Sequence, residues 1–207
     1  MSSIACDVVI LPNSGLSAMA ISASQKLAAL DTLFTLKLGE FYPHDSVYML
    51  QLNEADIPSA KELLAKVAAI TNELQLTAIR FDQTKCFFDV EYFKPNELQR
   101  LQDDVVAALN PIRDGLRDKD KPRMLQSTGL ALENYKNYGW NTIGELYRPH
   151  MTLSRFKNEQ TNPQELLPDV SSFSGVFSRL ALFEMGDNGT AVRVIAEFEL
   201  AGSSTVR

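Results

Sequence analysis

Stretches that alternate apolar and polar residues follow stretches with apolar residues at helical spacing along this chain. Residues 4–11, an apolar and β-branched run, predict a first strand, and residues 15–30 predict a helix. The further predicted strands are 33–39, 44–52, 78–81, 86–93, 150–156, 179–185 and 191–200. The further predicted helices are 57–75 with Asp56 as its cap, 97–109 with a capping box of Asn96 and Gln99, a short one at 128–138, and another opened by Asn162 and Pro163.

The order of these elements contains an internal repeat. The hairpin turns are expected at residues 82–85 and 187–189. A strand, a helix and a hairpin therefore follow one another twice, in blocks of about 40–93 and 145–200. This repeat predicts one bilobal α+β domain over residues 1–201, in which two antiparallel sheets face a central cleft about a pseudo-twofold axis and helices lie outside. We expect residues 202–207 to form a frayed tail.

Each block opens on a histidine, and these two are the only histidines of the chain. The first lies in residues 40–47 (EFYPHDSV) and the second in residues 145–153 (ELYRPHMTL). With one inserted residue allowed, both read Glu, aromatic or apolar, Tyr, Pro, His, any residue, hydroxyl residue, aliphatic. A duplicated His-x-Ser/Thr in a chain without other histidines indicates a paired acid–base site.

Strand alternation gives each histidine a hydroxyl group on its own face. The side chains expected on the first such face are His44, Ser46 and Tyr48, and those on the second are Arg148, His150, Thr152 and Ser154. Each hydroxyl lies two residues, roughly 7 Å, beyond its imidazole. The opposite faces, which should pack on helices, carry Val47, Met49, Met151 and Leu153.

Composition and charge restrict the class of protein. The net charge of −6 disfavours a grip on long nucleic acid, which needs an excess of Lys and Arg, so we expect a small anionic ligand or an RNA end. No apolar run approaches the about 20 residues of a membrane span. Cys6 and Cys86 lack CxxC spacing, which is typical of a reducing, cytoplasmic setting. Two histidines and two scattered cysteines fall short of a zinc site, so we expect no metal and no cofactor.

Paired imidazoles and hydroxyls suit the hydrolysis of a phosphodiester or cyclic phosphate. One imidazole takes a proton from the attacking water or hydroxyl and the other protonates the leaving oxygen, because histidine titrates near neutrality. Ser46 and Thr152 would hydrogen-bond the non-bridging oxygens, where charge builds in the transition state. The repeat leaves open which of His44 and His150 is the acid and which is the base.

These residues resemble the motifs of the 2H phosphoesterase superfamily, which includes bacterial 2′–5′ RNA ligase-like proteins and 2′,3′-cyclic phosphodiesterases. Its two His-x-Ser/Thr-x motifs match His44-Asp45-Ser46-Val47 and His150-Met151-Thr152-Leu153. In the first motif Ser46 stands where Thr is commoner, and Asp45 where an apolar residue is frequent. The resemblance, which extends to the element order over residues 4–200, implies a bilobal fold and metal-independent action on cyclic phosphates or 2′–5′ linkages.

Side chains beside the motifs have a structural interpretation as well as a functional one. Arg148 shares the face of His150 and can contact a substrate phosphate or form a surface salt bridge. Arg155 falls on the opposite face and is expected in solvent. Tyr48 and Ser154 are candidate substrate contacts, although Tyr48 fits equally well as filler between the sheet and a loop.

The irregular stretch 110–147 adds aromatic and basic candidates. Trp140, with Tyr135 and Tyr138, either stacks on a nucleobase or packs this stretch onto the body of the protein. The basic residues of 113–123 are interleaved with aspartates, which favours a solvated loop over electrostatic guidance of an RNA end.

The sequence therefore predicts a monomeric cytoplasmic phosphoric diester hydrolase that opens a 2′,3′-cyclic phosphate on a nucleotide or RNA end. Two other enzymes stay open: a 2′–5′ ligase of RNA ends, and a phosphodiesterase for 2′–5′ oligoadenylate or another cyclic nucleotide. A module that binds RNA or nucleotides without turnover is the alternative of another class. Two titratable imidazoles argue against it, because binding alone does not need them.

Overall fold

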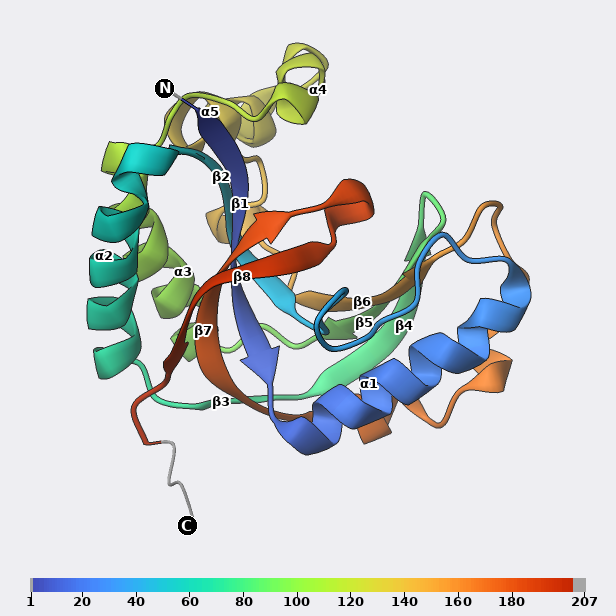
Figure 1. Cartoon of the computed structure of the whole chain (residues 1–207). Coiled ribbons are helices and arrows are strands. Elements are labelled where there is room, and N and C mark those ends of the chain that lie inside the picture. Colours follow the sequence, from blue (N-terminus) through green and yellow to red (C-terminus); the bar gives the residue numbers. More distant parts are fainter. Residues whose placement is uncertain (1, 203–207) are drawn as a thin grey trace.

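The structure, a computed structural model, describes residues 2–202 and consists of an antiparallel sheet with helices around it (Figure 1). Its strands are β1 (Ser3–Pro12), β2 (Asp45–Asn53), β3 (Leu74–Leu76), β4 (Ala78–Thr84), β5 (Phe87–Tyr92), β6 (His150–Arg155), β7 (Gly175–Met185) and β8 (Ala191–Glu199). Its α-helices are α1 (Ser14–Leu27), α2 (Ile57–Ile70), α3 (Asn96–Leu109), α4 (Lys121–Leu125) and α5 (Gly129–Tyr138). The α+β class predicted from the sequence is confirmed.

The sheet has the strand order β3-β7-β1-β2-β6-β5-β4, with β8 paired to β7. This order is symmetric about the boundary between β2 and β6, so that β1 corresponds to β5 and β7 to β4. Within the sheet, one described residue pair, Asp45 with Met151, connects β2 to β6 and so the two halves. The two expected sheets are therefore connected at their edges by the two histidine strands.

Two helices cross between the halves and hold them together. Helix α1 follows β1 but packs against β6, whereas α3 follows β5 but packs against β2. In Figure 1, α2 and α3 lie along one side of the sheet and α1 lies at the far end. The buried stripe of α3 is the one that its helical spacing predicts, and it consists of Leu98, Leu101, Val105 and Leu109. Each histidine strand is thus backed by a helix from the other half.

The helix predicted over 57–75 is too long, because α2 ends at Ile70 and the chain then enters β3. Thr71 is extended, and its carbonyl accepts a 2.7 Å hydrogen bond from the Ala201 N–H. Leu74 pairs with Phe177 of β7. Pairing with a distant segment overrides the local helical pattern here.

The strand predicted over 33–39 is wrong, although its alternation is real. Phe34 and Leu36 are buried in the core, and the Leu36 N–H donates to the Ser24 hydroxyl at 2.9 Å. Within residues 2–202 this segment joins no ladder of paired residues: the Leu33 N–H donates to the Arg155 carbonyl at 2.7 Å beside the end of β6, and Lys37 forms an isolated bridge with Phe41. An extended loop that points every second side chain inward has the same pattern as a half-buried strand.

The hairpin between β4 and β5 turns later than expected. β4 continues to Thr84, and the turn consists of Lys85 and Cys86, which have φ values of 51° and 68°. Two residues with positive φ form the type I′ turn that suits the twist of a hairpin. The expected second hairpin is present as β7 and β8.

The predicted side-chain capping bonds do not form, although Asp56 does occupy the N-cap position of α2. Neither Asp56 nor Asn96 accepts a side-chain capping bond; Pro95 occupies the N-cap position of α3. Gln99 instead bonds the Lys94 ammonium at 3.0 Å. The expected short helix near 128–138 is confirmed as α5, and the one after Asn162 is a 3₁₀ turn, Pro163–Leu166.

Of the expected tail, only Gly202 belongs to the described residues, and 203–207 lie outside them. Within residues 2–202, each helix is either too short or too polar to cross a bilayer.

Candidate active site

His44 and His150 lie at corresponding points of adjacent strands and line one cleft. His44 immediately precedes β2, and His150 is the first residue of β6. The cleft has a volume of about 460 Å³, and Ser46 and Thr152 line it together with both imidazoles. The structure therefore brings together the two histidines and two hydroxyls that the sequence singled out.

A main-chain carbonyl fixes the orientation of each imidazole. His44 Nδ1 lies 2.7 Å from the carbonyl oxygen of Tyr42, and His150 Nδ1 lies 2.8 Å from that of Arg148. A carbonyl only accepts, so Nδ1 carries a proton in both rings and Nε2 is the basic atom of the neutral form. Both rings thus keep Nε2 for proton transfer in the cleft.

Each cleft hydroxyl is held by a carboxyl group on the neighbouring strand. Ser46 Oγ lies 2.7 Å from Asp7 Oδ2, and Thr152 Oγ1 lies 2.8 Å from Asp89 Oδ1. Asp7 is in β1 and Asp89 is in β5, which are the symmetry-related strands. The motifs of the sequence did not point to either aspartate; the signal would have been an aspartate inside a predicted apolar strand.

A β-bulge on β2 changes the face that the later residues present. Tyr48 pairs with Val8 and Ser46 with Val9, so Val47 is an extra residue without a partner. Val47 and Tyr48 are both fully buried in the core, and Met49 instead lines the cleft. The expectation that Tyr48 faces the cleft is therefore not met; its hydroxyl donates to the Tyr138 carbonyl at 2.6 Å.

The same bulge occurs at the corresponding place on β6. Ser154 pairs with Phe88 and Thr152 with Asp89, which leaves Leu153 without a partner. Ser154 is buried away from the cleft and donates to the Phe34 carbonyl at 3.1 Å, and Arg155 lines the cleft. The face assignments of Ser154 and Arg155 are thus reversed relative to simple alternation.

Arg148 lines the cleft, but carboxylates already surround its guanidinium. Its nitrogens lie 3.2 Å from Asp82, 3.1 Å from Asp89 and 2.9 Å from Glu91. Because Asp89 also accepts the Thr152 hydroxyl, Arg148 positions that hydroxyl through Asp89. The salt-bridge interpretation of Arg148 fits this geometry better than a direct phosphate contact.

Arg155 has the opposite environment. Its guanidinium lies 4.6 Å from the Phe87 ring centre and donates to Asn188 Oδ1 at 2.5 Å. Within residues 2–202 it forms no ion pair, and its Nε atom is buried without a hydrogen-bond partner. Arg155 is therefore a cation of the cleft that no carboxylate of the described part of the chain pairs with.

The aromatic candidates separate into two groups. Trp140 lines the cleft and is 7% exposed, so its ring forms part of a wall rather than a free platform. Tyr135 is buried and Tyr138 packs against the core, and neither lines the cleft.

The cleft is cationic although the protein is acidic. Among the described residues that line it, Asp89 is the one carboxylate, and the cationic residues are Lys85, Arg117, Lys119, Arg123, Arg148 and Arg155. Three of them come from the stretch expected to be a solvated loop. Their place in the cleft depends on the path that the chain takes after α3, and the local sequence pattern does not predict this path.

The environments of His44 and Asp7 shift their protonation in opposite senses. Burial lowers the pKa of His44 to about 4, the bond to Tyr42 opposes this, and the charge of His150 adds to the lowering. Burial raises the pKa of Asp7 to about 7, against the bond from Ser46 and the positive charge of Arg117. His44 Nε2 lies 3.9 Å from Asp7 Oδ2. At neutral pH His44 is therefore an uncharged base.

Asp45, the unusual residue of the first motif, lies at the junction of the two halves. Its carboxyl group is fully buried, accepts a hydrogen bond from the His150 main chain, and lies 3.4 Å from the Tyr147 hydroxyl. Burial raises the pKa of Asp45 well above its ordinary value. A side chain of the first motif thus holds the backbone of the second.

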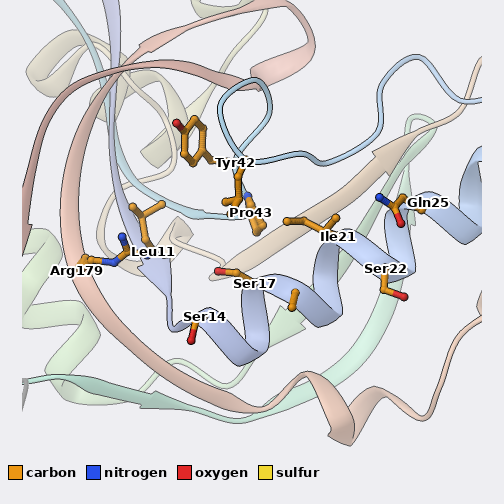
Figure 2. A pocket seen from close by; sticks show the side chains of 11 residues that line it. Leu11, Ser14, Ser17, Ile21, Ser22, Gln25, Tyr42, Pro43 and Arg179 are labelled. Carbon is orange, nitrogen blue, oxygen red and sulfur yellow. The ribbon is translucent and has the colours of Figure 1, made fainter. Parts of the chain in front are cut away.

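A second cavity, of about 500 Å³, lies between α1 and the loop before β2 (Figure 2). Figure 2 shows Ser17 and Ile21 of α1 facing Tyr42 and Pro43 across it. Its lining contains no residue of the two His-x-Ser/Thr-x motifs, and its one charged residue, Arg179, is paired with Glu197. This cavity lacks the groups for acid–base chemistry, which belong to the cleft.

Solved structures show that this chain shares its fold with known proteins. TT0787 of Thermus thermophilus is 16% identical, with a TM-score of 0.63 over 97% of this chain and 100% of that one. E. coli LigT, crystallised with NADP+, is 12% identical, with a TM-score of 0.56 over 96% and 99%. A structure described as a phosphoesterase is 10% identical, with a TM-score of 0.55 over 96% and 99%. The chain thus has the fold of the 2H phosphoesterase superfamily, as its motifs indicated.

A comparison of the sequence with models of protein families shows the family to which the chain belongs. A model described as "Protein of unknown function (DUF1045)" matches residues 51–184, and the chain belongs to this family. The matched stretch contains His150 and Thr152 and begins after His44. A comparison with curated proteins gives no match.

Proposed function

We propose that the protein is a phosphodiesterase that opens the 2′,3′-cyclic phosphate, or a related cyclic or 2′–5′ diester, of a nucleotide or RNA end. One observation carries this proposal: two imidazoles, each held at Nδ1 by a carbonyl, line one cleft with a hydroxyl two residues beyond each. The similar fold of E. coli LigT, crystallised with phosphate, 3′-AMP and ATP, supports a substrate of this chemical class.

The difference between the two imidazoles assigns their roles. His44, neutral above pH 4 or so because of its lowered pKa, takes a proton from water at Nε2 as the water oxygen attacks phosphorus. The bond from phosphorus to one ribose oxygen breaks, and His150 donates its Nε2 proton to that oxygen. The products are a phosphomonoester and a free hydroxyl, with the two histidines in exchanged protonation states.

The groups between the imidazoles stabilise the charge on the non-bridging oxygens. Arg155 is the cation that we expect to contact these oxygens, since it forms no ion pair with the carboxylates of residues 2–202 and contacts Phe87 and Asn188. In the structure the Ser46 hydroxyl donates to Asp7. When Asp7 takes up a proton, which its raised pKa favours, the Asp7 carboxyl donates to Ser46 Oγ instead, and the Ser46 hydroxyl is free to donate to the phosphate. Both proton transfers use imidazoles, so the proposed step needs no metal.

The alternatives differ in what attacks phosphorus. A 2′- or 3′-hydroxyl in place of water gives 2′–5′ joining of RNA ends or its reversal, with the same two proton transfers. A binding module without turnover needs no difference between the protonation states of His44 and His150.

The free thiols of Cys6 and Cys86 are consistent with the expected cytoplasmic location. We propose that the protein is a monomer.

The experiment is turnover of 2′,3′-cyclic nucleotides in EDTA, followed by separation of the 2′- and 3′-phosphate products. We expect activity that falls by a factor of about 100 or more in His44→Gln and in His150→Gln. Gln25→Ala, in the second cavity, is the matched control and should retain activity. Normal turnover in either histidine variant contradicts the mechanism, and nucleotide binding without product favours the module.

A further inference from the structure

Three cations of the cleft take no part in the proposed chemistry. Arg117, Lys119 and Arg123 come from the stretch between α3 and α5 and line the same cleft as the histidines. They are separate from β6, which carries His150 and Arg155. In Figure 1 the β7–β8 turn projects between α4 on one side and the β4–β5 turn on the other. The cleft thus has two groups of cations, and Arg117, Lys119 and Arg123 form what we call its second cationic end.

One buried carboxylate serves two of these cations. Asp120 is fully buried and lies 2.5 Å from Arg117 and 3.2 Å from Arg123. Lys119, between them in the sequence, forms no ion pair within residues 2–202. Among the described residues, Asp120 is therefore the carboxylate that forms ion pairs with this group, and Asp7 acts on it at longer range, so that positive charge is in excess at this end.

This excess is unfavourable without an anion. Burial, and then the charge of Arg117, lower the pKa of Lys119, and Arg123 acts in the same direction. Asp120 and Asp7 only partly oppose the effect. Arg117 is held rigidly, since it is 1% exposed and also contacts the Met185 sulfur at 2.9 Å. A built-in cluster of like charges at the edge of a cleft is typical of an anion site.

We propose that this end of the cleft binds a second phosphate group of the same substrate molecule, a phosphomonoester on the far side of the sugar from the reacting diester. The inference rests on the proposed function for the position of the diester. A monoester carries close to two negative charges at neutral pH and so balances more of this excess positive charge than a diester, which carries one. The substrate class is then a small cyclic phosphate that also bears a terminal phosphate.

Binding tests this site independently of turnover. By calorimetry at fixed ionic strength, we expect adenosine 3′,5′-bisphosphate to bind at least about tenfold more tightly than adenosine 3′-monophosphate, as one charge-assisted contact allows. Lys119→Gln and Arg123→Gln should reduce that ratio to near one. Lys121→Gln is the matched control, because Lys121 is exposed, pairs with Asp118 and does not line the cleft. Equal affinities of the two ligands for the unmodified protein would overturn the inference.

Turnover then distinguishes the source of the second phosphate. Adenosine 2′,3′-cyclic phosphate is compared with its 5′-phosphorylated form and with a dinucleotide that ends in the cyclic phosphate. We expect the 5′-phosphorylated form to have the highest kcat/KM, by about tenfold or more. A higher kcat/KM for the dinucleotide would contradict the proposal that the second site binds a phosphomonoester and would favour an RNA end as the substrate. If the bisphosphate binds tightly but none of the three is hydrolysed, the second site stands and the proposed function fails.

Discussion

The Ser46 hydroxyl lies 2.7 Å from a carboxyl oxygen of Asp7, a residue with no exposed surface. The corresponding pair on the other half, Thr152 and Asp89, has nearly the same distance but a different environment, since Arg148 neutralises Asp89. The site is therefore symmetric in geometry and asymmetric in charge. In the proposed mechanism the base is His44, whose pKa is lowered by burial, and the acid is His150.

The pH dependence of turnover should reflect the neutral state of His44. Because burial lowers the pKa of His44 to about 4, the acidic limb of kcat/KM should lie near pH 4 rather than near the ordinary histidine value. Initial rates with a 2′,3′-cyclic nucleotide between about pH 3.5 and 9 measure it, with pH-jump controls for unfolding. A limb near the ordinary value would contradict the assignment of His44 as the base.

The stability of the protein should carry the signature of Asp7. Its pKa is raised to about 7, so the folded state binds a proton that the unfolded state releases, and stability falls as pH rises from about 4 to 7. The contribution has an upper limit of about 4 kcal/mol. His44, with a lowered pKa, acts the other way: it loses stability as pH falls from 6.5 towards 4.

We therefore measure the free energy of unfolding of Asp7→Asn and of the unmodified protein in urea at about pH 5 and about pH 8. The difference between the two proteins should favour the variant more at about pH 8 than at about pH 5. Asp118→Asn is the matched control, because Asp118 is fully exposed and its removal should change little. An identical pH dependence in Asp7→Asn and the unmodified protein would show that Asp7 is ionised throughout.

Arg148 and Arg155 should differ in what their removal affects. Arg148→Met leaves three carboxylates together and should lower the free energy of unfolding by about 1–3 kcal/mol, less than for a fully buried pair because its side chain is 35% exposed. Arg155→Gln removes no ion pair and should lower kcat/KM about a hundredfold, with a stability change below about 1 kcal/mol. Unfolding curves and turnover on both variants decide it; the reverse pattern would contradict the two environments.

Tyr48 tests the bulge on β2. Tyr48→Phe removes the hydrogen bond to the Tyr138 carbonyl, beside which Asn110 Oδ1 lies 3.2 Å from the same hydroxyl, so the free energy of unfolding should fall by about 1–2 kcal/mol. Because Tyr48 lies in the core, kcat/KM should not change. Loss of turnover without a change in stability would indicate that the Tyr48 side chain faces the cleft, and would contradict its place in the core.

Much of the candidate site could be predicted because its parts are local. His44 with Ser46, and His150 with Thr152, are two residues apart on one strand, and the side-chain period of a strand puts them on the same face whatever lies beside it. The stripe of α3 was predictable for the same reason, since a helix sets its own faces. The strand expected at 33–39 was wrong because alternation reports burial, and a strand also needs a neighbour.

By itself, therefore, the sequence determined the repeated His-x-hydroxyl unit, the helical faces and the α+β class. The tertiary structure decided which further residues join the site. The bulges at Val47 and Leu153 arise only against the register of β1 and β5, and each moves the residue two positions later, Met49 or Arg155, into the cleft. Contacts between segments distant in sequence bring Asp7, Asp89 and the cations of 117–123 to the site, and a local sequence pattern cannot predict such contacts.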